Sequence, residues 1–184
     1  MPGLTVPNFI VHYSRSEPFR SITSAPHDQR QMIIEKLNSA NAWGLNRFTD
    51  LSYLQERVQA ETKLRSALIA KGGKPELEQP IYFFLGRNKR FEEQKLNKGY
   101  KINLSHLLSK PLSFTYGDSM LALIEENRTQ SGIRYNNPLC KNVYRLDELA
   151  ELYSRVHFSE VPSLAIEAQL WIMPSKDSIK ILTD

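Results

Sequence analysis

Apolar and polar residues follow two different periods along this chain, one typical of helices and one typical of strands. Apolar residues at helical spacing, bounded by capping residues and helix breakers, predict helices. The expected helices cover residues 19–23, 29–39, 51–70, 118–126 and 145–156. Alternating or continuous apolar runs between turn residues predict strands. The expected strands cover residues 9–13, 81–85, 100–104, 112–116, 165–173 and 179–182.

The expected helices come early and most of the strands come late, with no repeat or low-complexity linker between them. Residues 127–142 are rich in glycine, asparagine and proline and predict a long loop. This order predicts an α+β fold with a largely antiparallel sheet. The chain has 184 residues, of which 41% are hydrophobic and 24% charged. We therefore expect one domain over residues 1–184, large enough for a hydrophobic core.

The strand around Glu167 carries the most informative polar residue. Apolar residues at the even positions 166–172 alternate with Glu167, Gln169 and Trp171. This alternation predicts one buried face and places Glu167 on the other, beside the small residue Ala165. A carboxylate fixed in a strand with room beside it is suited to act on a ligand. Exposed glutamates are also common in half-buried sheets, so both interpretations stay open.

Positive charge is concentrated in residues 82–110. The whole chain carries 24 Lys and Arg against 20 Asp and Glu, a net charge of +4. In this segment Glu92 and Glu93 are the acidic residues, and the basic ones are Arg87, Lys89, Arg90, Lys95, Lys98, Lys101 and Lys110. A solvated face is one interpretation. A groove for nucleic acid is the other, because Phe91 lies among these cations and single strands bind to charge combined with aromatic stacking surfaces.

Several classes of chemistry have no matching pattern in the sequence. A single cysteine, Cys140, excludes a disulfide framework and a cysteine-based zinc site and is typical of a reducing compartment. The four histidines have no metal-ligand spacing, and no phosphate-binding glycine loop or nucleophile elbow is present. The start of the chain lacks the pattern of a signal peptide, and no apolar run approaches the ~20 residues that span a bilayer. We expect a cytoplasmic protein with no metal and no membrane partner.

The residues suited to chemistry follow a definite order: a strand histidine, an arginine, an aromatic strand and a late glutamate. The segments are Ile10-Val11-His12 with Phe19-Arg20-Ser21-Ile22, Leu54-Gln55-Glu56-Arg57, Pro80-Ile81-Tyr82-Phe83-Phe84, residues 101–105 with 112–119, and Ile166-Glu167-Ala168-Gln169-Leu170. In this order the chain resembles the DarT-type toxins, ADP-ribosyltransferases that use NAD+ to modify bases in DNA. The resemblance covers roughly residues 9 to 182.

The resemblance implies an ADP-ribosyltransferase-like fold and NAD+ as co-substrate. It implies that Glu167 is the catalytic carboxylate, which would stabilise the oxocarbenium-like ribose formed when nicotinamide leaves. Arg57 would be the second catalytic residue, binding the NAD+ phosphates or helping to deprotonate the acceptor base. His12, Ser14 and Tyr82 would contribute to the NAD+ site, Tyr82 by stacking on the nicotinamide ring.

Simpler interpretations of these residues stay open. Spacing alone makes Arg57 a surface helix residue paired with Glu61 at i+4. His12 is equally a partly buried strand histidine, and Tyr82 a core aromatic. Asp118 and Ser119 lie near the expected cleft, but plain helix capping accounts for them.

The acceptor and partners follow from the same resemblance. Arg87, Lys89 and Arg90 are candidate contacts for single-stranded DNA or RNA, and Arg134, Tyr135 and Asn136 are candidate contacts for the acceptor base. Ala165 stands where many protein-modifying ADP-ribosyltransferases carry Gln or Glu, which favours a nucleobase acceptor. A toxin of this kind implies an antitoxin partner. The alternatives are an ADP-ribosyltransferase acting on RNA or protein, another NAD+-using or phosphate-transferring enzyme, and a non-catalytic nucleic-acid-binding module.

Overall fold

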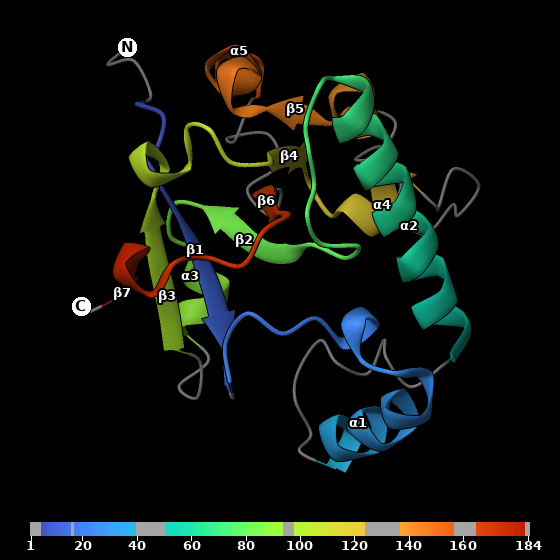
Figure 1. Cartoon of the computed structure of the whole chain (residues 1–184). Helices are drawn as coiled ribbons and strands as arrows, with labels where there is room; N and C mark the ends of the chain where they lie inside the picture. The colour runs from blue at the N-terminus through green and yellow to red at the C-terminus, as the bar shows by residue number, and fades with distance from the viewer. Residues whose placement is uncertain are drawn as a thin grey trace.

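A sheet of seven antiparallel strands organises the described part of the chain (Figure 1). The computed structural model describes residues 5–15, 17–39, 51–93, 98–123, 137–156 and 165–182. The strands are β1 (Phe9–Ser14), β2 (Ile81–Leu85), β3 (Lys98–Asn103), β4 (Leu112–Tyr116), β5 (Tyr144–Arg145), β6 (Ile166–Leu170) and β7 (Ile179–Ile181). Their order across the sheet is β5-β4-β6-β2-β1-β3-β7. The predicted α+β class with an antiparallel sheet is confirmed.

Helices flank this sheet. The α-helices in the described residues are α1 (His27–Ser39), α2 (Leu51–Ala70), α3 (Lys89–Glu92), α4 (Ser119–Leu123) and α5 (Leu149–Arg155). Short 3-10 turns are η1 (Ile22–Ser24), η3 (Leu104–Leu107), η5 (Pro138–Lys141), η6 (Leu146–Glu148) and η7 (Lys176–Ser178). None of the helices in the described ranges is long and apolar enough to cross a membrane.

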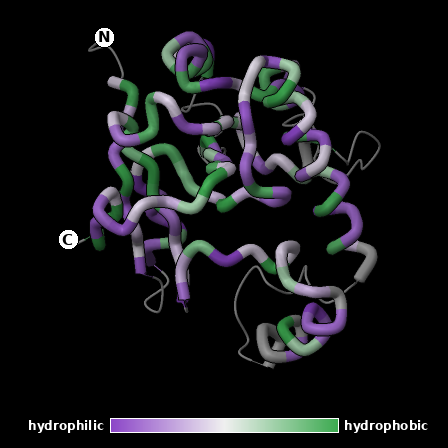
Figure 2. Tube along the Cα trace, in the orientation of Figure 1, coloured by the Kyte–Doolittle hydropathy of each residue, from purple (hydrophilic) through white to green (hydrophobic). Residues whose placement is uncertain are grey.

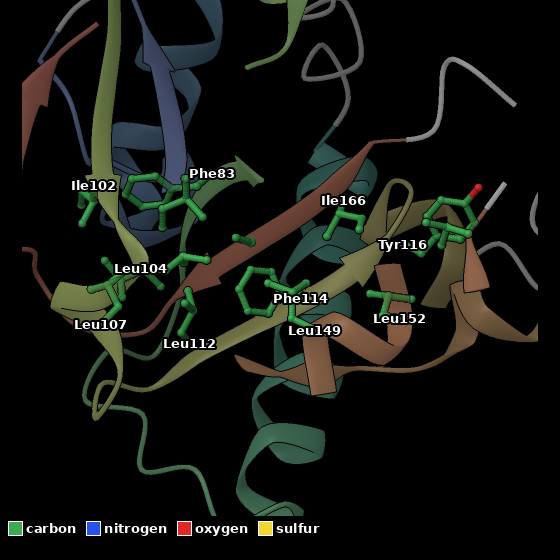
Figure 3. Close-up of a cluster of buried hydrophobic side chains, with 14 of the residues drawn as sticks. Phe83, Ile102, Leu104, Leu107, Leu112, Phe114, Tyr116, Leu149, Leu152 and Ile166 are labelled. Atoms are coloured by element: carbon green, nitrogen blue, oxygen red, sulfur yellow. The ribbon is translucent and has the colours of Figure 1, made fainter. Parts of the chain in front are cut away.

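One face of the sheet packs on the main hydrophobic core. Alternate residues of neighbouring strands point to this face, because side chains in register lie on the same side of a pleated sheet. Phe83 and Phe114 are the largest of them with less than 2% of their surface exposed. Leu149 and Leu152 of α5 cover this face beside Phe114 (Figure 3). Figure 2 shows the hydrophobic residues concentrated in the strands, as the sequence pattern predicts.

The opposite face of β6 is also buried, which differs from the prediction of a strand with one buried face. Gln169 and Trp171 have no exposed surface. The long helix α2 covers them, since its Leu64 and Leu68 pack on Trp171. The packing of α2 on this face could not be deduced from the alternation within β6 itself.

A buried hydrogen-bond network holds the register of β4 and β6 under α2. Ser113 Oγ donates to Gln169 Oε1, and Gln169 Nε2 donates to Thr115 Oγ1, each at 2.9 Å. Trp171 Nε1 donates to Ser113 Oγ, also at 2.9 Å. Each of these buried side chains therefore has a hydrogen-bond partner, as low-dielectric surroundings require.

Several predicted elements differ at their ends for identifiable reasons. The helix expected at 19–23 is reduced to η1, because Phe19 has the left-handed φ of 64° and cannot continue a right-handed helix. The helix expected at 145–156 starts later, since Arg145 pairs with Ser113 as part of β5. The strand expected at 165–173 stops at Leu170, and the Trp171 carbonyl instead accepts hydrogen bonds from residues 76 and 77. Most of the predicted loop, residues 127–136, lies outside the described residues.

Candidate active site

Glu167 lies in β6, between β2 and β4 near the middle of the sheet. Phe84 and Thr115 are its register partners on the two neighbouring strands. Its side chain is half-buried, and Oε2 accepts a hydrogen bond of 3.1 Å from the backbone N–H of Ser119. The carboxyl group is therefore held between a central strand and the first residue of α4.

The turn between β4 and α4 brings Ser119 to this position. Gly117 has a φ of 86°, which favours glycine, and its N–H donates to the Ala165 carbonyl at 2.8 Å. Asp118 then caps the helix, because its Oδ1 accepts from Met120 N at 3.0 Å. The capping role predicted for Asp118 is confirmed.

The surroundings of Glu167 favour its protonated form. Burial and the nearby charge of Asp118 raise the pKa of Glu167 to about 7, against the opposing effects of the Ser119 N–H and Arg57. A carboxyl group with this pKa exchanges a proton readily near neutral pH, which suits a general acid or base.

Arg57 reaches the same region from α2. Its guanidinium carbon lies 4.4 Å from the centre of the Tyr82 ring, and its Nε lies 3.3 Å from Glu61 Oε1. The predicted i,i+4 pair of Arg57 and Glu61 is confirmed, but it is not on the surface. The Arg57 side chain is 19% exposed and that of Glu61 only 1%. Burial opposes the charge of Arg57, yet Tyr82, Glu61 and Glu167 raise its pKa overall, so it stays a cation.

The ring of Tyr82 lies against the Arg57 guanidinium. Tyr82 pairs with Gln169 in register and therefore lies on the same face of the sheet as Glu167. Burial raises the pKa of its phenol, so the hydroxyl remains protonated. Arg57 already covers one face of the ring. The stacking of Tyr82 on nicotinamide stays a prediction, and it requires the other ring face or a shift of Arg57.

His12 lies on the other face of the sheet, among the core residues. Its ring centre is 5.5 Å from that of Phe83, whereas Glu167 shares a face with Tyr82. Nδ1 lies 2.7 Å from the Tyr82 carbonyl oxygen, and Nε2 accepts from Phe19 N at 3.2 Å. The carbonyl can only accept and the amide can only donate, so the ring is neutral with its proton on Nδ1. Burial lowers the pKa of His12.

The structure thus does not bring His12 next to Glu167. β1 pairs with β2 at Ile10 and Val11. The next residue, His12, contacts β2 through its ring, which lies within hydrogen-bond distance of the Tyr82 carbonyl. Ser14, at the end of β1, donates to the Glu17 carbonyl at 3.5 Å. A role for His12 and Ser14 at NAD+ stays a prediction.

The basic segment begins at the end of β2 that carries Phe84, the register partner of Glu167. Phe84 packs on Phe91 of α3, with 4.9 Å between ring centres. Lys89 and Arg90 are exposed on this helix, and Arg87 just before it pairs with Glu92 at 2.8 Å. These cations therefore lie near the same end of the strand as Glu167. Lys95 and the predicted base contacts Arg134, Tyr135 and Asn136 lie outside the described residues.

Other features of the described residues do not add to this site. A shallow cavity of about 340 Å³ is lined by Asn8, Asn103, Leu149 and their neighbours, and Glu167 is not among its lining residues. No group of three His, Cys, Asp or Glu side chains gathers as metal ligands within the described ranges. Cys140 is fully buried, and burial raises the pKa of its thiol to about 11, so it is poorly reactive.

Glu61 is the site residue that the sequence analysis did not single out. The apolar stripe of α2 runs from Leu54 through Val58 and continues, at the same spacing, to Leu64 and Leu68. Glu61 lies within that stripe. A charged residue inside an apolar helical stripe was the available signal.

Comparison with known proteins found no matching family model, no matching curated protein and no matching solved structure.

Proposed function

We propose that this protein is an NAD+-dependent ADP-ribosyltransferase that transfers ADP-ribose to a nucleobase of single-stranded DNA. The observation that carries the proposal is the arrangement of Glu167, Arg57 and Tyr82 on one face of the sheet. The side chains of Glu167 and Arg57 are both partly buried there and partly exposed to solvent. The resemblance to the DarT-type toxins assigns the same three residues to catalysis and NAD+ binding.

The reaction needs a carboxylate beside the ribose of NAD+. The bond from the ribose C1′ to nicotinamide breaks, nicotinamide leaves as a neutral base, and positive charge develops on the sugar. Ionised Glu167 would stabilise that charge, which is the main electrostatic demand of the step. A ring nitrogen of the acceptor base then bonds to C1′ and loses its proton. A carboxyl group with a pKa of about 7 is able to accept that proton at neutral pH.

Arg57 is suited to the anionic part of NAD+. Its planar guanidinium is always charged and forms paired hydrogen bonds with phosphate oxygens. The ring of Tyr82 lies 4.4 Å from the guanidinium carbon and supports it from one side. Binding of the pyrophosphate by Arg57 would place the nicotinamide ribose near Glu167.

The acceptor is assigned to single-stranded DNA because of the cations near the end of β2. Lys89 and Arg90 are exposed there beside the aromatic cluster of Tyr13, Phe84 and Phe91. Such a combination supports binding of a strand whose bases are not paired. Modification of DNA is toxic to a cell, so the proposal includes an antitoxin protein as partner.

Two other functions make different predictions. An ADP-ribosyltransferase for RNA or protein uses the same site and places the label on a different acceptor. A nucleic-acid-binding module without catalysis predicts salt-sensitive binding that is indifferent to NAD+ and to Glu167. Offering labelled NAD+ to single-stranded DNA, RNA and a protein extract in one reaction separates these functions. Label on DNA supports the proposal, and label on RNA or protein alone rejects it.

A further inference from the structure

Glu61 is the second buried carboxyl group of this cluster, and the proposed reaction gives it no role. It is 1% exposed and lies on the face of α2 that packs on the sheet. Its Oε1 lies 3.3 Å from Arg57 Nε. Among the described residues, its Oε2 and the Tyr82 hydroxyl make no hydrogen bond of good geometry, although Thr23 and Tyr82 lie close enough to lower the pKa of the Glu61 carboxyl group.

Stability does not explain a glutamate at this position. A buried acceptor without a partner weakens a fold, and buried ion pairs are often replaced by apolar residues without loss of stability. Leu64 and Leu68 occupy the same stripe, so a leucine at position 61 would fit the pattern of the helix. A buried polar group that costs stability requires another explanation, and its contact with Arg57 supplies one.

We propose that Glu61 is a positioning residue that fixes the Arg57 guanidinium through Nε and divides its positive charge between two carboxyl groups, Glu61 and Glu167. Burial raises the pKa of both carboxyl groups, and Arg57 is the cation that lowers both. While Glu61 is ionised, its negative charge offsets part of the effect of Arg57 at Glu167, so Glu167 keeps its proton to a higher pH. The consequence for ADP-ribose transfer rests on the proposed function, whereas the division of charge does not.

The groups that face the two carboxyls come from four places in the fold. They are Arg57 from α2, Tyr82 from β2, Asp118 and Ser119 from the turn before and the start of α4, and Thr23 from η1; Tyr53 of α2 acts on Arg57. Asp118 raises the pKa of Glu167 and the Ser119 N–H lowers it. The substitution at position 61 changes none of these groups, so a change in the titration of Glu167 is assigned to the loss of the Glu61 charge beside Arg57.

The test is the variant Glu61→Gln. Glutamine keeps the size of the side chain and an oxygen that accepts from Arg57 Nε, but it removes the charge. The titration of Glu167 is followed by NMR of protein labelled with ¹³C at the glutamate carboxyl carbon, and its signal is assigned with Glu167→Gln. We expect its titration midpoint to fall by about one pH unit in Glu61→Gln. Glu151→Gln is the matched control, since Glu151 is exposed on α5 and pairs with Arg155. We expect Glu151→Gln to leave the titration midpoint of Glu167 unchanged.

A midpoint of Glu167 that stays in place or rises in Glu61→Gln overturns the inference. A second variant, Glu61→Leu, also removes the contact with Arg57 Nε, and we expect it to raise the KM for NAD+ roughly tenfold more than Glu61→Gln does. Equal KM values in two folded variants would contradict the positioning role.

The two proposals fail in different ways. If the wild-type protein transfers no ADP-ribose but the Glu167 midpoint falls in Glu61→Gln, the proposed function is wrong and the division of charge stands. If transfer occurs and the midpoint does not move, the division of charge is wrong and the proposed function stands.

Discussion

The backbone N–H of Ser119 donates a hydrogen bond of 3.1 Å to Oε2 of Glu167, which joins the first residue of α4 to a central strand. The adjacent bond from Gly117 N to the Ala165 carbonyl closes the same junction. The carboxyl group is thus held by backbone groups of two regular elements and their turn. Sites on such elements are positioned more accurately than sites on long loops.

Glu167 gives the folded protein a specific dependence on pH. Its pKa is raised from 4.5 to about 7, so the folded state holds the proton to a higher pH than the unfolded chain does. The free energy of unfolding therefore falls as pH rises from about 4.5 to 7. One pKa unit corresponds to about 1.4 kcal/mol, and the partial exposure of the side chain reduces the whole effect on the free energy of unfolding to on the order of 2 kcal/mol.

The check is urea unfolding of the wild type and Glu167→Gln between pH 4.5 and pH 8. The neutral glutamine removes this contribution, so the wild type loses stability relative to the variant as pH rises. Parallel curves for the two proteins would show that the carboxyl group is not perturbed.

Arg57 and Glu61 should show strong coupling in a double-mutant cycle. Arg57→Met leaves the Glu61 carboxyl buried without its cation, and we expect a loss of about 3 kcal/mol. Glu61→Leu leaves Arg57 partly exposed without its carboxylate partner, and we expect the free energy of unfolding to fall by about 1 kcal/mol. The double variant should cost about 2 kcal/mol less than the sum of the two. Urea unfolding at pH 7 measures all four proteins, and additivity within about 0.5 kcal/mol would mean that the two side chains do not interact.

Ser113 holds two buried partners at once, Gln169 Oε1 and Trp171 Nε1. Ser113→Ala leaves both groups without this hydrogen-bond partner, and we expect the free energy of unfolding to fall by about 2–6 kcal/mol, from about 1–3 kcal/mol for each unpaired group. Ser66→Ala is the control, because Ser66 is exposed on α2 and the same change there should be within about 0.5 kcal/mol. An equal change of the melting temperature in Ser113→Ala and Ser66→Ala would contradict the buried network.

His12 should make the fold sensitive to acid in the opposite sense to Glu167. Burial lowers its pKa below 6.5, so the unfolded chain takes up a proton before the folded state does. Stability is lost as pH falls through 6.5 toward the folded pKa, because a protonated Nε2 cannot accept from Phe19 N. His12→Asn should remove this loss. The difference in urea midpoint between the wild type and the variant, measured from pH 7.5 to pH 5, tests it, and a constant difference would count against it.

Local patterns predicted the strands that flank the site and missed what depends on packing between elements. The bounds of Ile81–Leu85 and Leu112–Tyr116 agree with the prediction, since each is an apolar run that starts after a proline and ends before a turn. The second buried face of β6 depends on where α2 lies, which no local period specifies. The same packing turns Glu61 inward.

The position of His12 relative to Glu167 is a question of register. A strand pattern indicates which residues alternate, but it does not say which face of β1 matches which face of β6 across an intervening strand. The pairing of β1 with β2 and of β2 with β6 places His12 on the core face and Glu167 on the other. The order of residue types along the chain predicted one site for all four residues. The structure brings Arg57, Tyr82 and Glu167 together, whereas His12 lies on the other face of the sheet.

The measurement that tests the central claim most directly is mass spectrometry of a mixed single-stranded oligonucleotide incubated with NAD+ and the purified protein. Reactions with the wild type, Glu167→Gln and the exposed-site control Glu151→Gln run in parallel. We expect a mass increase of one ADP-ribose with the wild type and the control. With Glu167→Gln we expect a decrease of at least about 100-fold in rate and an unchanged fold by circular dichroism. An oligonucleotide that is modified at the same rate by Glu167→Gln, or by none of the three proteins, would contradict the account.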